Sequence, residues 1–383
     1  MQTDVLIIGG GCGGLETAIE LRKQAPETVI TLVTPSAFLV YRPWLIYLPA
    51  QQRRFEQLQV SLQQVATTYR LRLITDTVGR LDLDHHQAEL SKSEPITYHS
   101  VVVATGAPAD KERIPGAASH ALFPCDVVEA LDFRDRFLAL REGVVSVILA
   151  GERPGPGLEY AGWLATAVHE RGLVDQIHIQ VVDHQDRLKV LLGDKATALI
   201  ERFLARKGAR WIAGQAGQAI HADGVELEHG MSWPTALSTV VGPLRGVDVG
   251  LTAPVVDEQG FVLLQTTFQR IHQLDLFAVG DSIRLPEGLE VPKTWMMTRR
   301  QAALVTQNLA AHTSGRELRS LDIDRMRRSP LRMNMPDVGG WTVAVRDGRV
   351  LASGSWPLLL RTLMDRRYLK ARTSPTSSFQ EQG

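Results

Sequence analysis

The sequence is poor in cysteine and has no excess of either charge. Its 383 residues include two cysteines, Cys12 and Cys125, too few for a secreted disulfide framework or a four-cysteine metal site. We therefore expect a reducing, cytoplasmic setting. Lys+Arg and Asp+Glu both number 42, so the formal charge is zero. Because no strong field is available to attract nucleic acid, we do not expect nucleic-acid binding.

Long apolar runs and several catalytic motifs are also absent. No segment reaches the roughly 18 to 20 uninterrupted apolar residues of a membrane-spanning helix. The apolar stretch 38–49 is interrupted by an arginine and two prolines, so we expect only peripheral membrane contact. The first apolar run starts almost at the initiator methionine and leaves no room for a signal peptide. We find no G-x-S-x-G elbow and no P-loop, and His85-His86 lacks matching ligands at metal spacing, so no metal site is predicted.

What the chain does contain is a strand–helix–strand alternation that occurs twice. Residues 5–9 predict a buried strand, 11–24 a glycine loop that opens a helix, and 29–35 a second strand. The same order returns in 144–183. Such alternation is typical of parallel sheets, so the sequence predicts an α/β fold with two Rossmann-like dinucleotide-binding domains. Alternating apolar and polar residues in 71–106 predict a small antiparallel meander that interrupts the first domain.

A G-x-G-x-x-G motif follows the first predicted strand directly and opens the helix. Gly9 permits a tight turn, Gly11 lets the backbone approach a pyrophosphate, and Gly14 allows close helix–strand packing. The helix N-terminus supplies free N–H donors and positive potential, with Cys12 and Gly13 inside the same loop. Thr34 stands about 20 residues on, where an acidic residue usually binds a ribose hydroxyl; threonine can hydrogen-bond there without charge assistance.

Three segments together resemble a known family. They are GGGCGGLETA at 9–18, Ala104-Thr105-Gly106 and FAVGDS at 277–282. They look like the two-dinucleotide-domain flavoproteins that include type II NADH:quinone dehydrogenases, sulfide:quinone oxidoreductases and flavocytochrome c sulfide dehydrogenases, and the resemblance runs from residue 5 to about 309. It implies FAD as cofactor, with the Gly280-Asp281 turn at the ribityl or phosphate region and 104–106 passing close by.

The resemblance extends to several further positions. The stretch 291–309 resembles the segment that places a helix N-terminus beside the isoalloxazine ring and the quinone pocket. We place Lys293, Thr294, Trp295 and Met296 there, with Lys293 and Trp295 also as catalytic residues. A helix start at this position would stabilise the anion of reduced flavin. Ordinary core packing of residues 295–297 is the alternative. Predicted flavin contacts also include Val78 and, on a loop after the second strand, Arg42, for which a solvated side chain is the alternative.

The second dinucleotide unit leaves the electron donor open. Counting back from Gly157-Leu158-Glu159 puts Glu152 and Pro154 where the first two glycines should be; alternatively the loop begins at Gly151 with one extra residue. Either way its prolines lack N–H groups for a phosphate. Asp183 stands where a ribose-binding acid belongs, and Glu159 matches the glutamate of relatives that use NADH and is a predicted catalytic residue. NAD(P)H binding and a domain that keeps only the fold are both compatible with this pattern.

Cys125 falls approximately where the sulfide-oxidising relatives carry the first of their redox cysteines. The second would lie near Arg153, and no cysteine follows Cys125, so a disulfide relay would have to recruit Cys12. Reaction of Cys125 with flavin or substrate is one hypothesis; an inert, partly buried cysteine is the other.

The C-terminal part differs from the rest. A hairpin is predicted around Asp347-Gly348, then an amphipathic helix over 357–371, then a disordered tail from 374. The helix sets leucines (358, 359, 363 and 369) against basic residues (361, 366, 367 and 370). It is predicted either to dock on its own protein with the basic face in solvent or to rest on a membrane.

The predicted domains are 1–112 and 245–315 for FAD, 113–244 for the inserted NAD(P)H-like unit, and 316–383 for the C-terminal extension. The leading hypothesis is an FAD-dependent oxidoreductase that passes electrons from a reductant, NAD(P)H included, to a quinone. The alternatives are an FAD enzyme acting on a small organic metabolite, a sulfide:quinone oxidoreductase-like protein without the cysteine relay, and a flavin-binding protein without turnover. A homodimer and a peripheral position on the inner face of the cytoplasmic membrane are further expectations.

Overall fold

The computed structural model describes residues 1–151, 154–184, 187–251, 254–270, 273–289, 291, 293–322 and 334–373. Its first sheet is built from two separate parts of the chain, within residues 2–103 and 269–278. Parallel strands β1 (Gln2–Ile8), β2 (Ile30–Thr34), β5 (Arg72–Thr75) and β8 (Ile96–Val103) are joined by β19 (Gln273–Ala278), and β18 (Gln269–Arg270) pairs antiparallel with β19 at the edge. The order is β18-β19-β8-β1-β2-β5, so a strand from beyond residue 270 lies beside β8.

Two helices cover the start of this sheet. Helix α1 (Cys12–Gln24) follows β1 directly, and α8 (Trp295–Thr313) packs against it. The β1 side chains from Leu6 to Ile8 are almost fully buried, as expected of a central parallel strand covered on both faces. The antiparallel pair β6 (Val78–Asp82) and β7 (Gln87–Leu90) extends from β8 and is the predicted meander.

The second sheet is a separate parallel unit. Its order is β12 (Ala209–Ala213), β11 (Ile177–Asp183), β10 (Gly143–Leu149), β16 (Leu237–Val241) and β9 (Ala121–Leu122). Helix α5 (Pro154–Glu170) connects β10 to β11, with α4 (Val127–Ala139), α6 (Arg187–Leu192) and α7 (Asp194–Arg206) around them. The predicted α/β class with two Rossmann-like units is therefore confirmed.

Smaller elements complete the described structure. A three-stranded antiparallel sheet consists of β13 (Gly217–Ile220), β14 (Gly224–Leu227) and β15 (Ser232–Pro234). The remaining elements are short: β3 (Phe38–Val40), η1 (Arg42–Tyr47), η2 (Phe55–Leu58), β4 (Gln59–Ser61), α2 (Leu62–Thr68), η3 (Lys111–Arg113), α3 (Ala117–His120), η4 (Glu228–Gly230), β17 (Val262–Leu263), η5 (Gly280–Ser282) and β20 (Ile283–Arg284). They lie around the two sheets and connect them.

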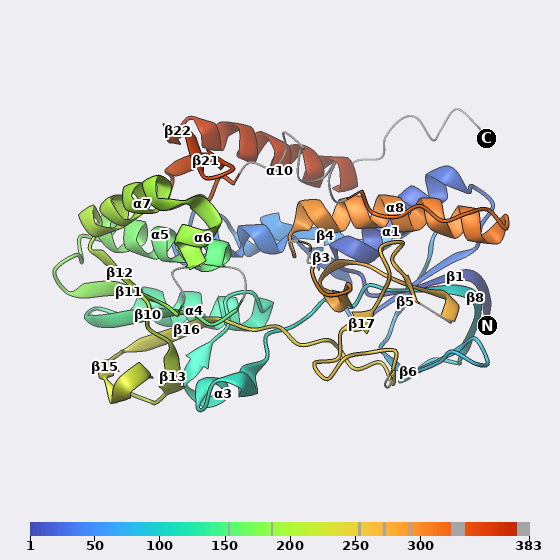
Figure 1. The fold of residues 1–383 in the computed structure, drawn as a ribbon, viewed down its shortest axis with the longest axis horizontal. Coiled ribbons are helices and arrows are strands. Elements are labelled where there is room, and N and C mark those ends of the chain that lie inside the picture. Colours follow the sequence, from blue (N-terminus) through green and yellow to red (C-terminus); the bar gives the residue numbers. More distant parts are fainter. Residues whose placement is uncertain are drawn as a thin grey trace.

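The C-terminal part crosses the molecule. Strands β21 (Thr342–Arg346) and β22 (Arg349–Gly354) form a hairpin whose turn, Asp347-Gly348, has positive φ at both residues. Helix α10 (Pro357–Thr373) then runs from the second unit, near α7, to the first, above α1 and α8 (Figure 1). The predicted disordered tail from 374 lies outside the described residues. Among the described helices, none combines the length and the apolar character needed to cross a bilayer.

Candidate functional site

The glycine loop after β1 packs tightly against the sheet at Gly9 and Gly14, but leaves space in front of the N-terminus of α1 at Gly11. A Cβ atom at Gly9 (φ +112°) would lie 2.4 Å from the carbonyl oxygen of Ala104, and one at Gly14 would lie 1.9 Å from that of Gly9. Both positions therefore require glycine. At Gly11, by contrast, a Cβ would meet nothing within 4 Å. Gly11 is exposed and caps α1 without any side-chain hydrogen bond, which leaves the first N–H groups of the helix available to a ligand.

Residues 104–106 line the other side of this opening. The Thr105 hydroxyl oxygen is buried and has no hydrogen-bond partner among the described residues. Gly106 (φ +70°) also has open space at its Cβ position. An unpaired buried polar atom beside an open helix N-terminus calls for a polar ligand, since such atoms are normally satisfied. The residues present therefore fit the diphosphate of a dinucleotide.

The Gly280-Asp281 turn reaches the same region from the far end of the chain. It forms η5 directly after β19, and Gly280 has φ +83°. Its N–H donates to Gln301 Oε1 at 2.7 Å, and Lys293 Nζ donates to the Asp281 carbonyl oxygen at 2.8 Å while lying 3.6 Å from the Phe261 ring centroid. Gln301 was not predicted as a site residue. Only the tertiary structure shows that this buried α8 side chain holds the turn.

The start of α8 is an aromatic contact zone. Thr294 caps the helix by accepting from the Met297 N–H, and Met296 is half-buried. The Trp295 ring makes edge contacts with Tyr368 at 4.3 Å and Tyr41 at 5.5 Å between centroids. Trp295 thus packs against Tyr368 of α10.

Other predicted contacts lie at varying distances from the loop. Thr34 is buried at the end of β2, and a Cβ at Gly10 would lie 2.8 Å from its hydroxyl oxygen. Arg42 begins η1 with an exposed side chain, and Val78 is buried in β6. Their contacts with a cofactor stay predictions.

The two cysteines lie in different surroundings and are not bonded to each other. Cys12 is the first residue of α1; burial and then the nearby Glu16 raise the pKa of its thiol. Cys125 lies in the turn before α4, partly buried, and near the fully buried Tyr160. Burial raises the pKa of the Tyr160 hydroxyl, and the adjacent Cys125 adds to this shift.

The second glycine loop repeats the packing of the first. A Cβ at Gly151 would lie 2.4 Å from the carbonyl oxygen of Gly242, as Gly9 does against Ala104, and one at Gly157 would lie 2.1 Å from Leu149. The contact of Gly151 favours the count in which the loop begins at Gly151 with one extra residue over the count that puts Glu152 and Pro154 at glycine positions. Glu152 and Arg153 themselves lie outside the described residues. Pro154 and Pro156 fall in the first turn of α5.

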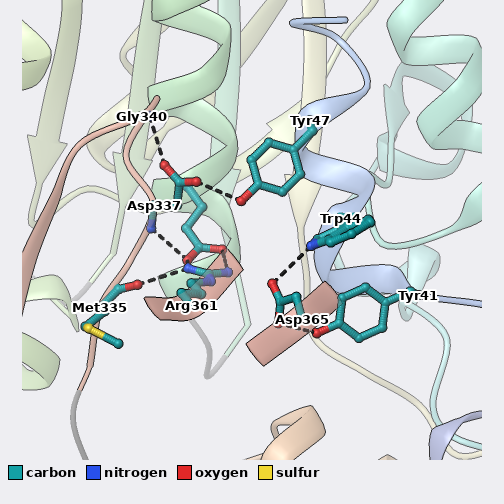
Figure 2. A network of polar contacts seen from close by, with 9 residues as sticks. Tyr41, Trp44, Tyr47, Met335, Asp337, Gly340, Arg361 and Asp365 are labelled. Atoms are coloured by element: carbon teal, nitrogen blue, oxygen red, sulfur yellow. Dashed lines mark hydrogen bonds and ion pairs between the residues drawn. The ribbon is translucent and has the colours of Figure 1, made fainter. Parts of the chain in front are cut away.

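Asp183 and Glu159 of the second unit are both engaged within the protein. Asp183 is fully buried, and its Oδ2 accepts from the Leu188 N–H at 3.4 Å. Glu159 accepts from the Asp337 N–H at 2.9 Å and from both terminal nitrogens of Arg361, one of them at 3.1 Å (Figure 2). Arg361 also donates to the Met335 carbonyl oxygen at 3.0 Å.

A buried polar network continues along α10 from this ion pair (Figure 2). Tyr47 donates to Asp337 Oδ2 at 2.7 Å, and the two oxygens of Asp365 accept from Tyr41 at 2.7 Å and from Trp44 Nε1 at 3.0 Å. Burial raises the pKa of the Asp337 carboxyl, although its hydrogen bonds from Tyr47 and a backbone N–H act in the opposite direction.

The orientation of α10 corrects a sequence prediction. We expected its basic residues to face solvent if the helix docked on the protein, yet Arg361 is largely buried, while Leu359 and Leu363 are 66% and 63% exposed. Helical periodicity alone does not show which side of the helix faces the protein. Here it is determined by buried acidic partners on other elements, such as Glu159 for Arg361. Arg366, Arg367 and Lys370 are exposed as expected.

Together these features are those expected of a protein that binds a dinucleotide at its first glycine loop and carries an altered loop in its second unit. The comparisons agree. The sequence profile of the pyridine nucleotide-disulphide oxidoreductase family matches residues 3–302, more than half of the chain, and the chain belongs to this family. The predicted flavoprotein resemblance is confirmed; the protein is an FAD-dependent oxidoreductase, with FAD as its cofactor.

Similar proteins include a sulfide-quinone reductase from Aquifex aeolicus, 25% identical over 332 residues that cover 81% of this chain and 76% of that protein. A type II NADH:quinone oxidoreductase from Staphylococcus epidermidis is 20% identical, covering 81% and 83%. Among solved structures, the sulfide:quinone oxidoreductase from Aquifex aeolicus has a TM-score of 0.86 at 22% identity over 99% of this chain and 94% of that one. NDH2 from Plasmodium falciparum in complex with NADH has a TM-score of 0.82 at 12% identity, with 98% and 96% covered.

Proposed function

We propose that this protein oxidises a reductant and delivers the electrons to a quinone. The support is the location of the open flavin loop beside the aromatic start of α8, together with relatives named as quinone reductases. When bound, FAD would supply two-electron redox chemistry between the donor and a quinone, whose reduction to the quinol also requires two protons.

The chain's own residues would bind and orient the cofactor. The α1 N-terminus and Thr105 would hold the diphosphate, and the Gly280-Asp281 turn, fixed by Gln301, would hold the ribityl region. The N-terminus of α8, capped by Thr294, would place positive potential beside the ring system and favour its reduced anion.

NAD(P)H is the first donor to test, because Gly151 and Gly157 keep the tight loop packing of a dinucleotide unit. A second function, oxidoreduction of a small organic metabolite without nicotinamide, is favoured by Pro154 and Pro156. These residues remove N–H donors from the first turn of α5, where a second diphosphate would bind. Sulfide is a third donor to compare.

Anaerobic mixing tests these options directly. The FAD-loaded protein is mixed with NADH, NADPH or sulfide, and loss of flavin absorbance is followed; a soluble quinone is then added. Rapid bleaching by one donor and recovery with the quinone is the expected result. If oxygen restores the flavin absorbance but the quinone does not, the proposal that a quinone is the electron acceptor is contradicted. No bleaching by any of the three donors would favour the metabolite enzyme or a flavin-binding protein without turnover.

We also propose that the protein works at the cytoplasmic face of a membrane through the outer side of α10. The exposed apolar residues on this side of the helix are Leu359, Leu360, Leu363 and Met364, with Trp356 exposed just before the helix begins. The exposed basic residues Arg366, Arg367 and Lys370 follow on the same helix. An exposed apolar patch next to basic residues fits an anionic lipid surface. Alternatively, a second copy of the chain covers this patch in a homodimer. Sedimentation in the absence of lipid would reveal such a dimer.

A further inference from the structure

The last turns of α10 lie against the start of α1, at the flavin loop. Arg372 donates twice to Glu16, from Nε to Oε1 at 3.0 Å and from Nη2 to Oε2 at 2.5 Å. Arg299, from α8, donates to the same carboxylate at 3.3 Å. The Glu16 and Arg372 side chains are 3% and 10% exposed, so this is a buried, bidentate ion pair joining residues 356 positions apart.

Glu16 lies one helical turn after Cys12 and on the same face of α1, next to the open N-terminus of that helix. The Tyr368 ring is near both residues, with the guanidinium of Arg372 4.6 Å from its centroid and that of Arg299 at 5.5 Å. Tyr368 in turn touches Trp295 at the start of α8. One side of α10 therefore covers the junction between the two helices that border the flavin site.

The charges at this junction do not balance. Arg299 and Arg372 contribute two positive charges and Glu16 one negative charge, so their sum is positive. That surplus adds to the positive potential at the α1 N-terminus, where the diphosphate of FAD carries negative charge.

We propose that α10 is a clamp on the flavin site, with Arg372 and Tyr368 as positioning residues that hold α1 in its FAD-binding geometry and slow release of the cofactor. Cofactor exchange then requires the C-terminal end of α10 to detach from α1. This inference rests on FAD binding at the α1 loop; it is independent of the donor and of quinone.

The test measures the first-order release of FAD from the purified holoprotein, followed by the rise in flavin fluorescence after dilution. Arg372→Met keeps the length of the side chain and removes the ion pair; we expect release at least about tenfold faster, the size of one charge-assisted pair. Arg372→Lys, which keeps the charge, should fall between wild type and Arg372→Met. Arg367→Met, an exposed change of the same charge on the same helix, should match wild type.

A second variant guards against a purely structural effect. Tyr368→Phe keeps the ring contacts with Trp295 and should release FAD at nearly the wild-type rate, whereas Tyr368→Ala should release it faster. If Arg372→Met lowers the melting temperature of the apoprotein but leaves FAD release unchanged, α10 is only a structural support and the clamp is wrong. A wild-type protein that binds no added FAD would instead contradict the flavin site itself.

Discussion

Glu16 and Glu159 occupy the same position in the two dinucleotide-type helices, two residues after the last glycine of each loop, and each binds an arginine of α10. Arg372 holds Glu16 and Arg361 holds Glu159. One helix at the end of the chain thus engages both Rossmann-like units through equivalent residues. The glycine loop after β1 is open although Glu16 is paired with Arg372. The pairing of Glu159 with Arg361 therefore does not by itself close the second glycine loop.

Loss of Arg361 should destabilise the fold. In Arg361→Met, Glu159 stays largely buried without its cation, and we expect the free energy of unfolding to fall by about 3 kcal/mol. Urea unfolding at neutral pH measures the change. Arg366→Met, on the exposed side of α10, is the matched control and should differ little from wild type. Adding Glu159→Gln to Arg361→Met should recover part of the loss; no recovery would mean that packing, not charge, is responsible.

The open space in front of α1 can be probed with a methyl group. Gly11→Ala should fold normally, because no protein atom lies within 4 Å of the added Cβ, but it should bind FAD about tenfold more weakly since the methyl group enters the diphosphate site. Gly155→Ala, at an equally open position in α5, should leave FAD binding unchanged. Titration of the apoproteins with FAD distinguishes the two. Equal affinities for both variants would place the diphosphate elsewhere.

The contact between α8 and the Gly280 turn predicts a role for Gln301. Gln301→Leu is similar in size but leaves the buried Gly280 N–H without its acceptor, which should lower the free energy of unfolding by about 1 to 3 kcal/mol.

Asp281→Ala should reduce FAD retention with a smaller effect on the fold. Thermal melts with and without FAD compare the variants. An Asp281→Ala protein that purifies fully yellow would remove Asp281 from the flavin site.

Asp337 makes the stability of the C-terminal loop depend on pH. Because burial raises the pKa of its carboxyl above the ordinary value near 4, the stability it contributes is complete below that value and is lost as pH rises through the raised pKa. Wild type should therefore lose stability relative to Asp337→Asn as the pH rises above the ordinary carboxyl value near 4. Urea unfolding in acid and at neutral pH provides the comparison. A difference that stays constant with pH would exclude titration of Asp337.

The outer side of α10 should bind lipid. Leu359→Glu with Leu363→Glu replaces two exposed apolar side chains and should weaken binding to anionic phospholipid vesicles at least about tenfold. Val128→Glu, at an exposed valine on α4, controls for added negative charge and should bind like wild type. Co-sedimentation with vesicles measures this. If the double variant binds vesicles as well as wild type does, the patch is not the lipid contact.

The sequence predicts those parts of the site that depend on local geometry. Gly9, Gly11 and Gly14 follow from the constraints on a strand–loop–helix turn, whereas Asp281 is expected only from the resemblance of residues 277–282 to a known family. The start of the second loop was ambiguous, because what identifies Gly151 is its approach to Gly242, more than 90 residues away. Arg361 and Asp365 could not be recognised as inward-facing, since their partners lie on α5 and η1.

The position of β19 constrains how the protein can assemble during synthesis. β8 is paired on one side with β1. On its other side β7 pairs with residues 96–97, but residues 101–103 pair with β19, which a ribosome makes only after the entire second sheet. Until then the nascent first sheet has an exposed edge, and such edges favour aggregation and mispairing. The inserted unit can therefore fold while the flavin-binding unit is still incomplete, so cofactor loading is expected to be a late, post-translational event.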